Sequence, residues 1–419
     1  MKKNLKLSYL GVLFSLLSAG VVFSSTTSDA KKKNYTITPK SKILKPYTKS
    51  KNVNKYTKHY LLLRSYMEKI EKNGGGKLTL KKGTYKISNS VCIPSNTTLV
   101  LKKGVKLVKI NKTGGAKYKA AQAMFQIVHP KVFNKNKKLT EYNGSHDVKI
   151  IGKGNPSVNL KNIKDAKGFV IAHSKNITIT GIKFTNMNTG HFIEADASMN
   201  AKIQNCSFSN ASSASQFNKE AINIDTPDPL TGGLNVKWSS QDRTVNQGLI
   251  IENCTFKNLN RAIGTHKYSQ KQDETGAWTI NCYHTGTIIR NNTFENIANS
   301  KTDSHAAIFM MNWKDTTITN NTFTNCQSAM DFRGLTPTLT VKANTLNNTP
   351  IAKAYGVAGR VNGVNSGTSV SEGNGWIEKD GIYYLGYKNT DTKSSVYSPI
   401  YNIFGVEYVS QIAEMNKQK

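Results

Sequence analysis

Titratable residues gather in four short segments, each of which combines a small apolar run with polar ends. The segments are GHFIEAD at 190–196, EAINID at 220–225, RAIGTHK at 261–267 and HAAIFM at 305–310. If each run is a strand and the strands stack, the carboxylates and the His266–Lys267 pair come within a few strand spacings of one another. Like charges raise the pKa of one carboxyl group, which stays protonated as an acid, while another stays ionised. We therefore expect Glu220, Asp225 and His266 to share one groove and to cleave glycosidic bonds.

Other residues near that groove are expected to bind the substrate. Aromatic rings stack on sugar faces as well as in cores, and two tryptophans fall in the long intervals between repeats. The substrate-binding set taken from the segments and intervals is Glu194, Asp196, Arg261, Lys267, His305, Trp238 and Trp278. Glu194 and Glu220 have a structural alternative, as partners of buried lysines or backbone groups.

Elimination would use the same groove differently. A base such as His266 or Lys267 would remove the proton alpha to a uronate carboxylate. That carboxylate would be neutralised by a basic residue or by calcium, and the candidates are Arg261, Arg333, or a calcium ion on Glu220, Asp225 and Asp228. Hydrolysis requires no cofactor and is slightly favoured, because carboxylates outnumber bases in these segments.

A repeat between residues 176 and 346 determines where these segments lie. NITITGIKF, AKIQNCSF, GLIIENCTF, GTIIRNNTF, DTTITNNTF and LTVKANTL each place a β-branched run before polar residues and an apolar anchor. A repeat unit cannot bury its apolar side alone, whereas stacked units build one continuous core. The expected core column is Phe184, Phe208, Phe256, Phe294, Phe323 and Leu346. The asparagines three residues before the anchors predict a structural ladder at a turn, made of Asn205, Asn253, Asn291 and Asn320.

The two ends of the chain differ from the repeat. Residues 1–30 are typical of an export signal, with lysines before an apolar stretch and small residues near Ala30. Residues 31–56 are rich in Lys, Thr and Asn, which predicts a flexible basic lead. Apolar spacings of three and four between Tyr60 and Ile70 predict an amphipathic helix that covers the open end of a stack. The segment 351–419 is expected to cover the other end, with a hairpin at 375–389.

This N-terminal order resembles the opening of proteins of the pectate lyase superfamily. The resemblance rests on a helix followed by GGGKLTLKKGTYKI, VCIPSNTTLVLKKGVKL and GSHDVKIIGKG, and it covers residues 57–350. It implies an all-β fold, a single right-handed parallel β-helix (a solenoid) with an N-terminal capping helix. Because that superfamily includes lyases, hydrolases and surface proteins without catalytic activity, the fold leaves the activity open.

Within the superfamily, polygalacturonases offer a partial match to the candidate site. EAINIDTPDP is similar to their aspartate-bearing segments, which implies Asp225 and Asp228 as the acids. GTHK is similar to their glycine–histidine segment at His266, and Arg333 in DFRG would stand for their basic substrate-binding residue. Their adjacent aspartate pair and their Arg-Ile-Lys sequence are absent from this chain.

Charge and cysteine content restrict the partners. The formal net charge is +33, and lysine supplies most of the 58 basic residues, so an acidic polymer is the expected partner. An acidic polysaccharide is favoured over nucleic acid, because the aromatic residues recur as a core column. No segment after residue 30 is apolar for eighteen residues, so the chain is not expected to be an integral membrane protein. The five cysteines lack metal spacing and are expected to be buried thiols.

The sequence therefore predicts a secreted protein that binds and cleaves an acidic polysaccharide. The alternative from another class is a wall-bound surface protein that binds polysaccharide without turnover. It is supported by GWIEKDGIYYLGYKN at 375–389, which resembles a single repeat of the cell-wall-binding modules of Gram-positive bacteria.

Overall fold

A computed structural model gives the coordinates of the chain. It describes residues 33–115, 119–212, 219–229, 232–265, 271–272, 278–279, 283–297, 306–311, 313–333, 339–349, 352–356, 376–379 and 382–385. The export signal expected at 1–30 and much of the segment 351–419 lie outside the described residues. Among the described residues, none of the helices combines the length and the apolar character needed to cross a lipid bilayer.

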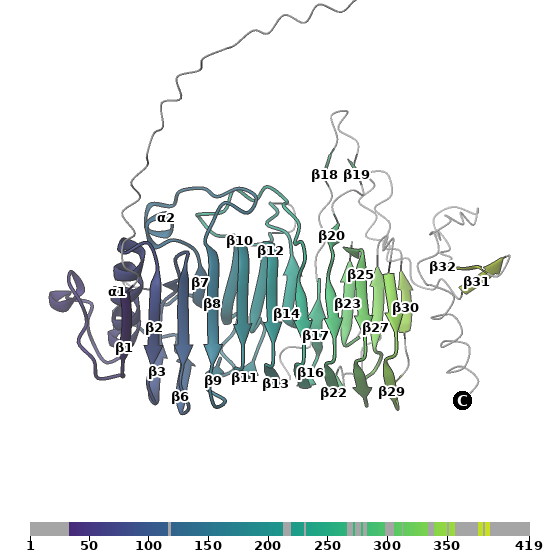
Figure 1. The fold of residues 1–419 in the computed structure, drawn as a ribbon, viewed down its shortest axis with the longest axis horizontal. Helices are drawn as coiled ribbons and strands as arrows, with labels where there is room; N and C mark the ends of the chain where they lie inside the picture. The colour runs from purple at the N-terminus through teal and green to yellow at the C-terminus, as the bar shows by residue number, and fades with distance from the viewer. Residues whose placement is uncertain are drawn as a thin grey trace, which may run out of the picture. The chain divides into compact units, whose positions relative to one another are not determined.

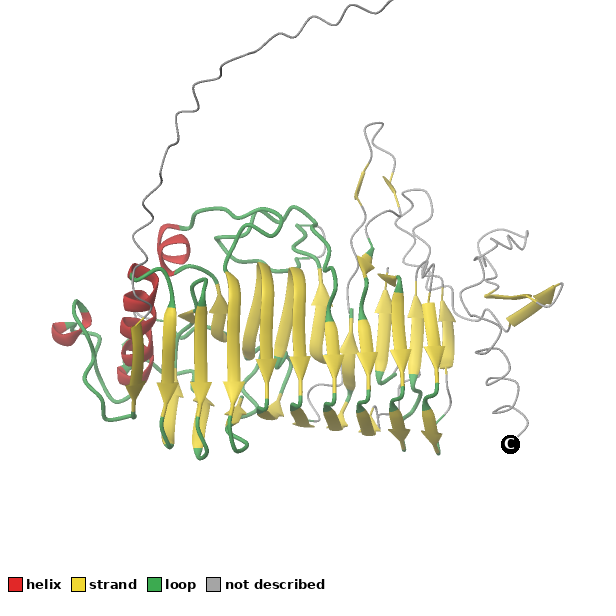
Figure 2. Cartoon of the chain, in the orientation of Figure 1, coloured by secondary structure: helices red, strands yellow, loops and turns green. Residues whose placement is uncertain are grey.

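Parallel strands stack into three faces that the chain visits in turn, which is a parallel β-helix (Figure 1, Figure 2). Its winding is right-handed, the hand that connections between parallel strands almost always take. The first face consists of β1 Lys33–Ile37, β2 Gly76–Leu80, β5 Thr97–Leu101, β8 His146–Gly152, the second halves of β10 Lys167–Thr180 and β12 Ile193–Gln204, β15 Ile250–Glu252, β21 Ile288–Arg290, β25 Thr316–Thr319 and β28 Leu339–Lys342.

The other two faces continue the same stack. The second face consists of β3 Gly83–Ile87, β6 Val105–Lys109, β9 Ser157–Asn159, β11 Lys183–Met187, β13 Ser207–Ala211, β16 Thr255–Leu259, β22 Thr293–Ile297, β26 Thr322–Thr324 and β29 Thr345–Asn347. The third face consists of β4 Val91–Cys92, β7 Ala123–Ile127, the first halves of β10 and β12, β14 Glu220–Asp225, β17 Arg261–Gly264, β23 Ile308–Met311, β27 Met330–Arg333 and β30 Ala352–Gly356.

β10 and β12 pass from the third face to the first without a loop. The bend in each falls at one residue with a positive φ, His173 at 48° and Ala197 at 53°. A single left-handed residue bends the strand from one face to the next without ending it. After β14 and β17, longer segments replace these bends, so the corner between the third and first faces is where these two coils leave the regular stack.

The predicted core column is confirmed. Phe184, Phe208, Phe256, Phe294 and Phe323 are each fully buried and occupy equivalent positions on the second face. Successive ring centroids are 4.6 to 4.9 Å apart and successive planes differ by 9° or less. This separation equals the spacing of neighbouring strands, so the register of the backbone imposes the stacking of the rings.

The asparagine ladder lies one residue later than predicted. Asn205, Asn253, Asn291 and Asn320 have φ between 52° and 56°, so they supply the left-handed residue of each turn from the first to the second face. The amide-to-amide ladder is made by the next residues: Asn292 Nδ2 donates to Asn321 Oδ1, and Asn321 Nδ2 donates to Asn344 Oδ1, both at 3.0 Å. Asparagine tolerates the left-handed region better than most side chains, which explains the first position, whereas the second uses the amide as both donor and acceptor.

The N-terminal capping helix is confirmed as α1, Lys58–Lys72. Its residues Leu61, Leu62, Leu63, Met67 and Ile70 are buried and belong to the core of the β-helix. Gly76, just after the helix, has φ 155°, and a Cβ there would lie 2.5 Å from the carbonyl oxygen of Lys33. Glycine is therefore required for the first two strands to pair.

The expectation of a flexible lead at 31–56 is wrong for part of that range. β1, Lys33–Ile37, pairs in parallel with β2 and forms the first strand of the first face. A short 3₁₀ helix, η1 Tyr47–Lys49, follows. Tyr47 Oη donates to Glu68 Oε1 at 2.7 Å, which attaches this segment to α1. Lysine-rich composition indicated disorder, whereas edge pairing and one aromatic anchor order the segment.

The remaining elements are short. α2, Pro130–Lys135, lies in the segment after β7. β20 His284–Thr285 pairs with β24 Trp313–Lys314, and β18 Lys271–Gln272 pairs with β19 Trp278–Thr279. β31 Trp376–Lys379 and β32 Ile382–Leu385 pair in antiparallel fashion within the range 375–389 where the sequence predicts a hairpin.

Candidate functional site

The outward side of the third face carries most of the predicted acidic residues. Glu194 pairs in register with Asn223, and Asp196 pairs with Asp225 on the neighbouring strand β14. Because side chains alternate along a strand, Ile193, Ala195, Ile222 and Ile224 point into the core, and these four polar residues point outward. Stacking thus places three carboxylates and one amide on one patch of two adjacent strands.

Two loops cover this patch and form what we call the roof, residues 128–145 and 232–247. The loops join through Leu139 N, which donates to Trp238 O at 2.9 Å, and through Lys138 Nζ, which donates to Ser239 O at 2.8 Å (Figure 1). Leu139, Leu234 and Trp238 pack on Val170 and Ala172 of the third face. The roof is therefore a second, smaller hydrophobic cluster outside the β-helix.

A cavity of about 420 Å³ remains between the third face and the roof. Glu194 and Asp225 line it, 4% and 3% exposed, together with Lys167, His191 and Lys219. The roof contributes residues 232–236 to the wall. This volume lies within the usual range for small-ligand sites, and convergent polar groups in such a cavity are typical of a binding or catalytic site.

Glu194 is held as a carboxylate by an ion pair. Its Oε2 forms an ion pair with Nζ of Lys167, which lies at the start of the neighbouring strand β10. Burial lowers the pKa of Lys167, but the neighbouring Glu194 carboxylate outweighs that effect, and the pKa of the lysine is raised. Both partners are therefore charged at neutral pH, with the carboxylate facing the cavity.

Asp225 is positioned by two amides at the end of β14. Asn223 Nδ2 donates to Asp225 Oδ2 at 3.1 Å. Asn246 Nδ2 donates to the carbonyl oxygens of Asp225 at 2.8 Å and Ala195 at 3.1 Å, so it joins the ends of two strands. Burial lowers the pKa of His284 to about 3, and its neutral Nδ1 accepts the backbone N–H of Asn246 at 3.0 Å.

Asp196 lies directly beside Asp225 and is fully buried. Neither of its carboxyl oxygens has a hydrogen-bond partner among the described residues. Burial, and then the charges of Glu194 and Asp225, raise its pKa well above the usual range, although Lys167 opposes this. The environment of Asp196 thus favours its protonated form within the acidic cluster, and the residue lies beneath the cavity rather than on its lining.

Glu220 does not share the site with Asp225, contrary to the sequence prediction. It lies on the core-facing side of β14 and is fully buried, and its Oε1 accepts from Arg261 Nη1 at 2.7 Å. Arg261 stacks over the Phe309 ring at 3.7 Å. His191 Nδ1 donates to the Glu220 carbonyl at 2.7 Å, which fixes the proton on Nδ1. Glu220 and Arg261 form a buried ion pair. Glu220 therefore has a structural role, with an arginine in place of the lysine considered from the sequence.

Two further predicted residues have structural roles. Trp238 is 1% exposed, and its Nε1 donates to Gln126 Oε1 at 2.9 Å, so it supports the roof and does not form a sugar platform. Asp228 is fully buried, 3.4 Å from Arg243 Nε, and does not line the cavity. The remaining predicted residues lie outside the described residues or have side chains that are not described, and they are His266, Lys267, Trp278, His305 and Arg333.

The calcium site considered from the sequence does not assemble. Glu220 points to the opposite side of β14 from Asp225, so the three proposed oxygen ligands do not converge. In the part of the chain that the structure describes, no group of three or more acidic, histidine or cysteine side chains has the arrangement of a metal site.

The cavity also contains Lys167, His191 and Lys219, which were not among the residues predicted from the sequence. His191 heads the same segment as Glu194, and Lys219 immediately precedes the EAINID strand. Their proximity to predicted strands was a usable signal. Lys167 had none, because its contact with Glu194 depends on the register between β10 and β12.

Comparisons with solved structures confirm the fold. The chain is similar to a surface adhesin of Streptococcus pneumoniae, PfbA, with 16% identity over 74% of this chain and 71% of that chain and a TM-score of 0.55. A second structure of the PfbA adhesin gives 15% identity, 76% and 89% coverage and a TM-score of 0.50. A family 28 exopolygalacturonase of Yersinia enterocolitica gives 12% identity, 76% and 67% coverage and a TM-score of 0.45. No protein-family model matches the chain, and no curated protein matches it in sequence.

These likenesses establish architecture alone. The right-handed parallel β-helix that the pectate lyase resemblance implied is the fold of this chain. At such low identity, the activity has to be argued from the cavity itself.

Proposed function

We propose that the protein is an exported glycoside hydrolase that cleaves an acidic polysaccharide in the cavity beneath the roof. The observation that carries the proposal is the pair Glu194 and Asp225, which line one cavity from adjacent strands and lie beside a third, protonated carboxyl group, Asp196. Glycosidic cleavage needs one carboxyl group that carries a proton and one that does not. Glu194 is paired with Lys167 and favours the ionised form, whereas Asp225 lies beside Asp196, whose pKa is raised.

The proposed roles follow from those environments. Asp196 and Asp225 lie in register on neighbouring strands, so their carboxyl groups share one proton between them. Asp225, the member that lines the cavity, delivers this proton to the leaving glycosidic oxygen. Glu194, ionised by its pair with Lys167, removes a proton from the attacking water. As the reaction ends, the proton from water is on Glu194 and returns to the Asp196–Asp225 pair through solvent.

Strand geometry indicates which stereochemical course to expect. Glu194 and Asp225 lie on adjacent strands and are offset by two residues, which separates their Cα atoms by about 8 Å. Both side chains leave the same side of the sheet, so we take their carboxyl groups to lie at a separation similar to that of the Cα atoms. Inverting enzymes hold their two carboxyl groups about 6.5–9.5 Å apart, to leave space for a water molecule, whereas retaining enzymes hold them closer. We expect inversion at the anomeric carbon, which NMR of the first product formed will show.

The charge of the chain supports an acidic substrate. Lys219 lines the cavity and is half-buried, without an ion pair among the described residues, so it is available to a uronate carboxylate. The formal net charge of +33 would also attract an acidic polymer over long range at low salt. Export is proposed from the character of residues 1–30.

Elimination has less support in the described residues. Arg261, one candidate to neutralise the uronate carboxylate, is buried against Glu220. Binding without turnover, as in a surface adhesin, is the other alternative, because the adhesin PfbA shares the fold.

One assay separates these three functions. The full chain is incubated with a panel of acidic polysaccharides, and both new reducing ends and the near-ultraviolet absorbance of unsaturated products are measured. Hydrolysis yields reducing ends without absorbance, elimination yields both, and an adhesin yields neither. We expect Asp225→Asn to lower the hydrolytic rate at least about 10³-fold through loss of the acid. The control Asp315→Asn, an exposed turn residue, should leave the rate unchanged. Undiminished hydrolysis by Asp225→Asn would refute the assignment.

A further inference from the structure

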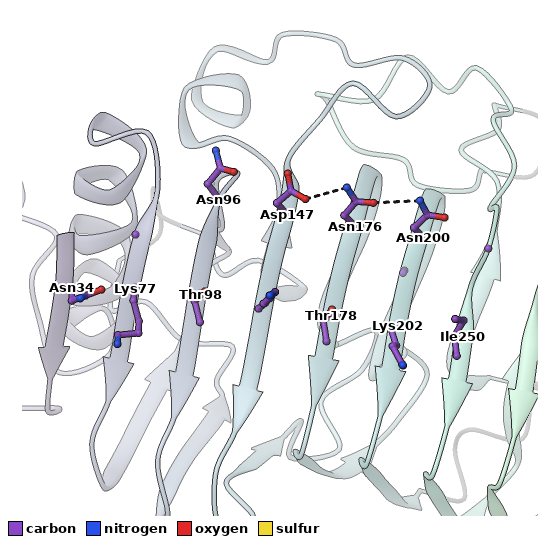
Figure 3. Close-up of a pocket in the computed structure, with 14 residues that line it drawn as sticks. Asn34, Lys77, Asn96, Thr98, Asp147, Asn176, Thr178, Asn200, Lys202 and Ile250 are labelled. Atoms are coloured by element: carbon purple, nitrogen blue, oxygen red, sulfur yellow. Dashed lines mark hydrogen bonds between the residues drawn. The ribbon is translucent and has the colours of Figure 1, made fainter. Parts of the chain in front are cut away.

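A second hollow lies on the first face, at a different face of the β-helix from the cavity. Its volume is about 840 Å³, and strands β1, β2, β5, β8, β10, β12 and β15 all contribute to its lining (Figure 3). Gly76, Ala201 and Gly248 line it without long side chains. The hollow therefore extends across consecutive coils, along the axis of the stack.

Lysine and threonine alternate along this hollow. Register places Lys77 beside Thr98, Thr98 beside Lys149, Lys149 beside Thr178, and Thr178 beside Lys202, which we call the first-face row. Figure 3 labels Lys77, Thr98, Thr178 and Lys202 of this row. Neighbouring strands are about 4.8 Å apart, so lysines on every second strand stand about 9.6 Å apart. Hydroxyl groups fill the positions between them.

The charges around the row leave it positive. Lys77 and Lys149 are exposed and have no ion pair among the described residues. Lys202 is 2.7 Å from Glu252, a carboxylate that Arg290 also binds at 2.7 Å. The one carboxylate that lines the hollow, Asp147, accepts from Asn176 Nδ2 at 3.0 Å and lies 2.7 Å from His146 Nδ1. Asn200 Nδ2 donates in turn to Asn176 Oδ1, so an amide row borders the lysines.

We propose that the first-face row is a non-catalytic binding site for an acidic polysaccharide that carries one anionic group per disaccharide. The chain would lie along the stack, with its anionic groups on Lys77, Lys149 and Lys202 and its hydroxyl groups on the intervening threonines. In an extended glycan, alternate sugars turn toward the same side, so such a polymer presents charges at an interval of two sugar units. Lysines on every second strand match that kind of interval.

The spacing disfavours nucleic acid. Each strand of duplex DNA carries a charge about every 3.4 Å, which is much denser than the lysine row. No aromatic side chain lines the hollow to stack on unpaired bases. The proposal does not depend on the cleavage chemistry, because the row and the cavity share no lining residue.

The second face supplies a matched control. Register places Lys106 beside Ser157 and Ser157 beside Lys183, and both lysines are exposed. The charge, the spacing and the intervening hydroxyl group are thus the same as in the first-face row. If the hollow is the binding site, only the replacement of the first-face lysines weakens binding. If general charge attraction is responsible, replacement of either pair weakens binding equally.

The test measures binding by affinity electrophoresis in gels that contain hyaluronate, which has one carboxylate per disaccharide. All chains carry Asp225→Asn, so that no polymer is cleaved. We expect Lys77→Ser with Lys149→Ser to raise the dissociation constant at least about fivefold, and Lys106→Ser with Lys183→Ser to raise it less than about twofold. Unchanged circular dichroism verifies folding, and Lys149→Glu alone provides a second variant that should weaken binding in the same direction.

Three outcomes would overturn the proposal. Equal weakening by the two lysine pairs would reduce the effect to net charge. Absence of hyaluronate binding by the parent chain would remove the ligand class. Tighter binding of duplex DNA through the same two lysines would make the row a nucleic-acid site. These binding results can be interpreted even if the protein does not cleave polysaccharide, because none of them depends on turnover.

Discussion

Asp196 and Asp147 are two aspartates whose carboxyl pKa values are shifted in opposite directions. Burial and the neighbouring Glu194 and Asp225 raise the pKa of Asp196, whereas hydrogen bonds from His146 and Asn176 lower that of Asp147. A raised pKa means that the folded state binds more protons than the unfolded chain above about pH 4, the ordinary pKa of aspartate. Folding stability should therefore fall as pH rises above about 4 because of Asp196, whereas Asp147 adds stability as pH rises toward about 4 from below.

Replacement of Asp196 by Asn should remove the unfavourable part of this pH dependence. The amide keeps the shape of the protonated carboxyl group and cannot ionise, so the variant should melt at least about 2 °C above the parent at pH 7.5 and much closer to it at pH 4. Thermal unfolding followed by circular dichroism at the two pH values measures this.

Asp147→Asn serves as the control of opposite sign. It should lower the melting temperature slightly at pH 7.5. It should have no effect at a pH low enough for the carboxyl group to be protonated in the folded state as well. Asp196→Asn melting below the parent at pH 7.5 would contradict the protonated state assigned to Asp196.

At the residue scale, the expectation that Asp225 faces a groove rests on its position at the end of a strand, and in the structure Asp225 lines the cavity. It could not separate Asp225 from Glu220, since alternation defines two faces without showing which one is buried. The deciding contact, from Glu220 to Arg261, joins residues 41 positions apart. Only the register between β14 and β17 places them together.

At the scale of elements, the turns at 291–292 and 320–321, from the first to the second face, use two neighbouring asparagines for different purposes. Asn291 has φ 56° and is exposed, whereas Asn292 is buried and satisfies the carbonyl oxygen of Ile251 at 3.0 Å and the backbone N–H of Cys254 at 2.9 Å. Buried backbone groups that lose their partners destabilise the folded state.

Asn292→Ala should therefore lower the free energy of unfolding by about 1–3 kcal/mol. Asn291→Gly, one residue earlier, should change it by less than about 0.5 kcal/mol, since glycine adopts the left-handed region freely. Urea unfolding of both variants measures the difference. Equal losses would show that the ladder has no special weight.

The repeat pattern predicts the strands of residues 176 to 346 and the phenylalanine column, because both follow from short-range periodicity. It misplaces the ladder by one residue, since an asparagine that adopts positive φ and one that points inward look alike in sequence. The prediction for residues 33 to 37 is wrong for a related reason. An edge strand with few apolar residues shows only a weak strand pattern in the sequence.

At the scale of the whole molecule, the cavity exists because two loops separated by about a hundred residues meet above one face. Leu139 and Ser239 form a parallel bridge, and Trp238 packs between that bridge and the third face. Loops this far apart leave no joint pattern in the sequence, so the roof could not be predicted, although the long intervals between repeats predict where insertions occur.

Trp238→Ala should open the roof while the β-helix stays folded. It removes a large side chain from the smaller cluster and leaves Gln126 Oε1 without the donor Trp238 Nε1, a local loss of about 3–5 kcal/mol. Polysaccharide cleavage should fall at least about tenfold, with little change in circular dichroism. Trp238→Phe, which retains most of the packing, should keep more of the activity. If Trp238→Ala also lost the β-sheet signal in circular dichroism, the roof would not be a unit separate from the β-helix.

The position of a bound glycan tests the central claim most directly. A crystal structure of the Asp225→Asn variant with an acidic oligosaccharide should show a glycosidic oxygen within hydrogen-bond distance of residue 225, with Glu194 on the opposite side of the same sugar. An oligosaccharide bound only outside the cavity, with Glu194 and residue 225 untouched, would contradict the account.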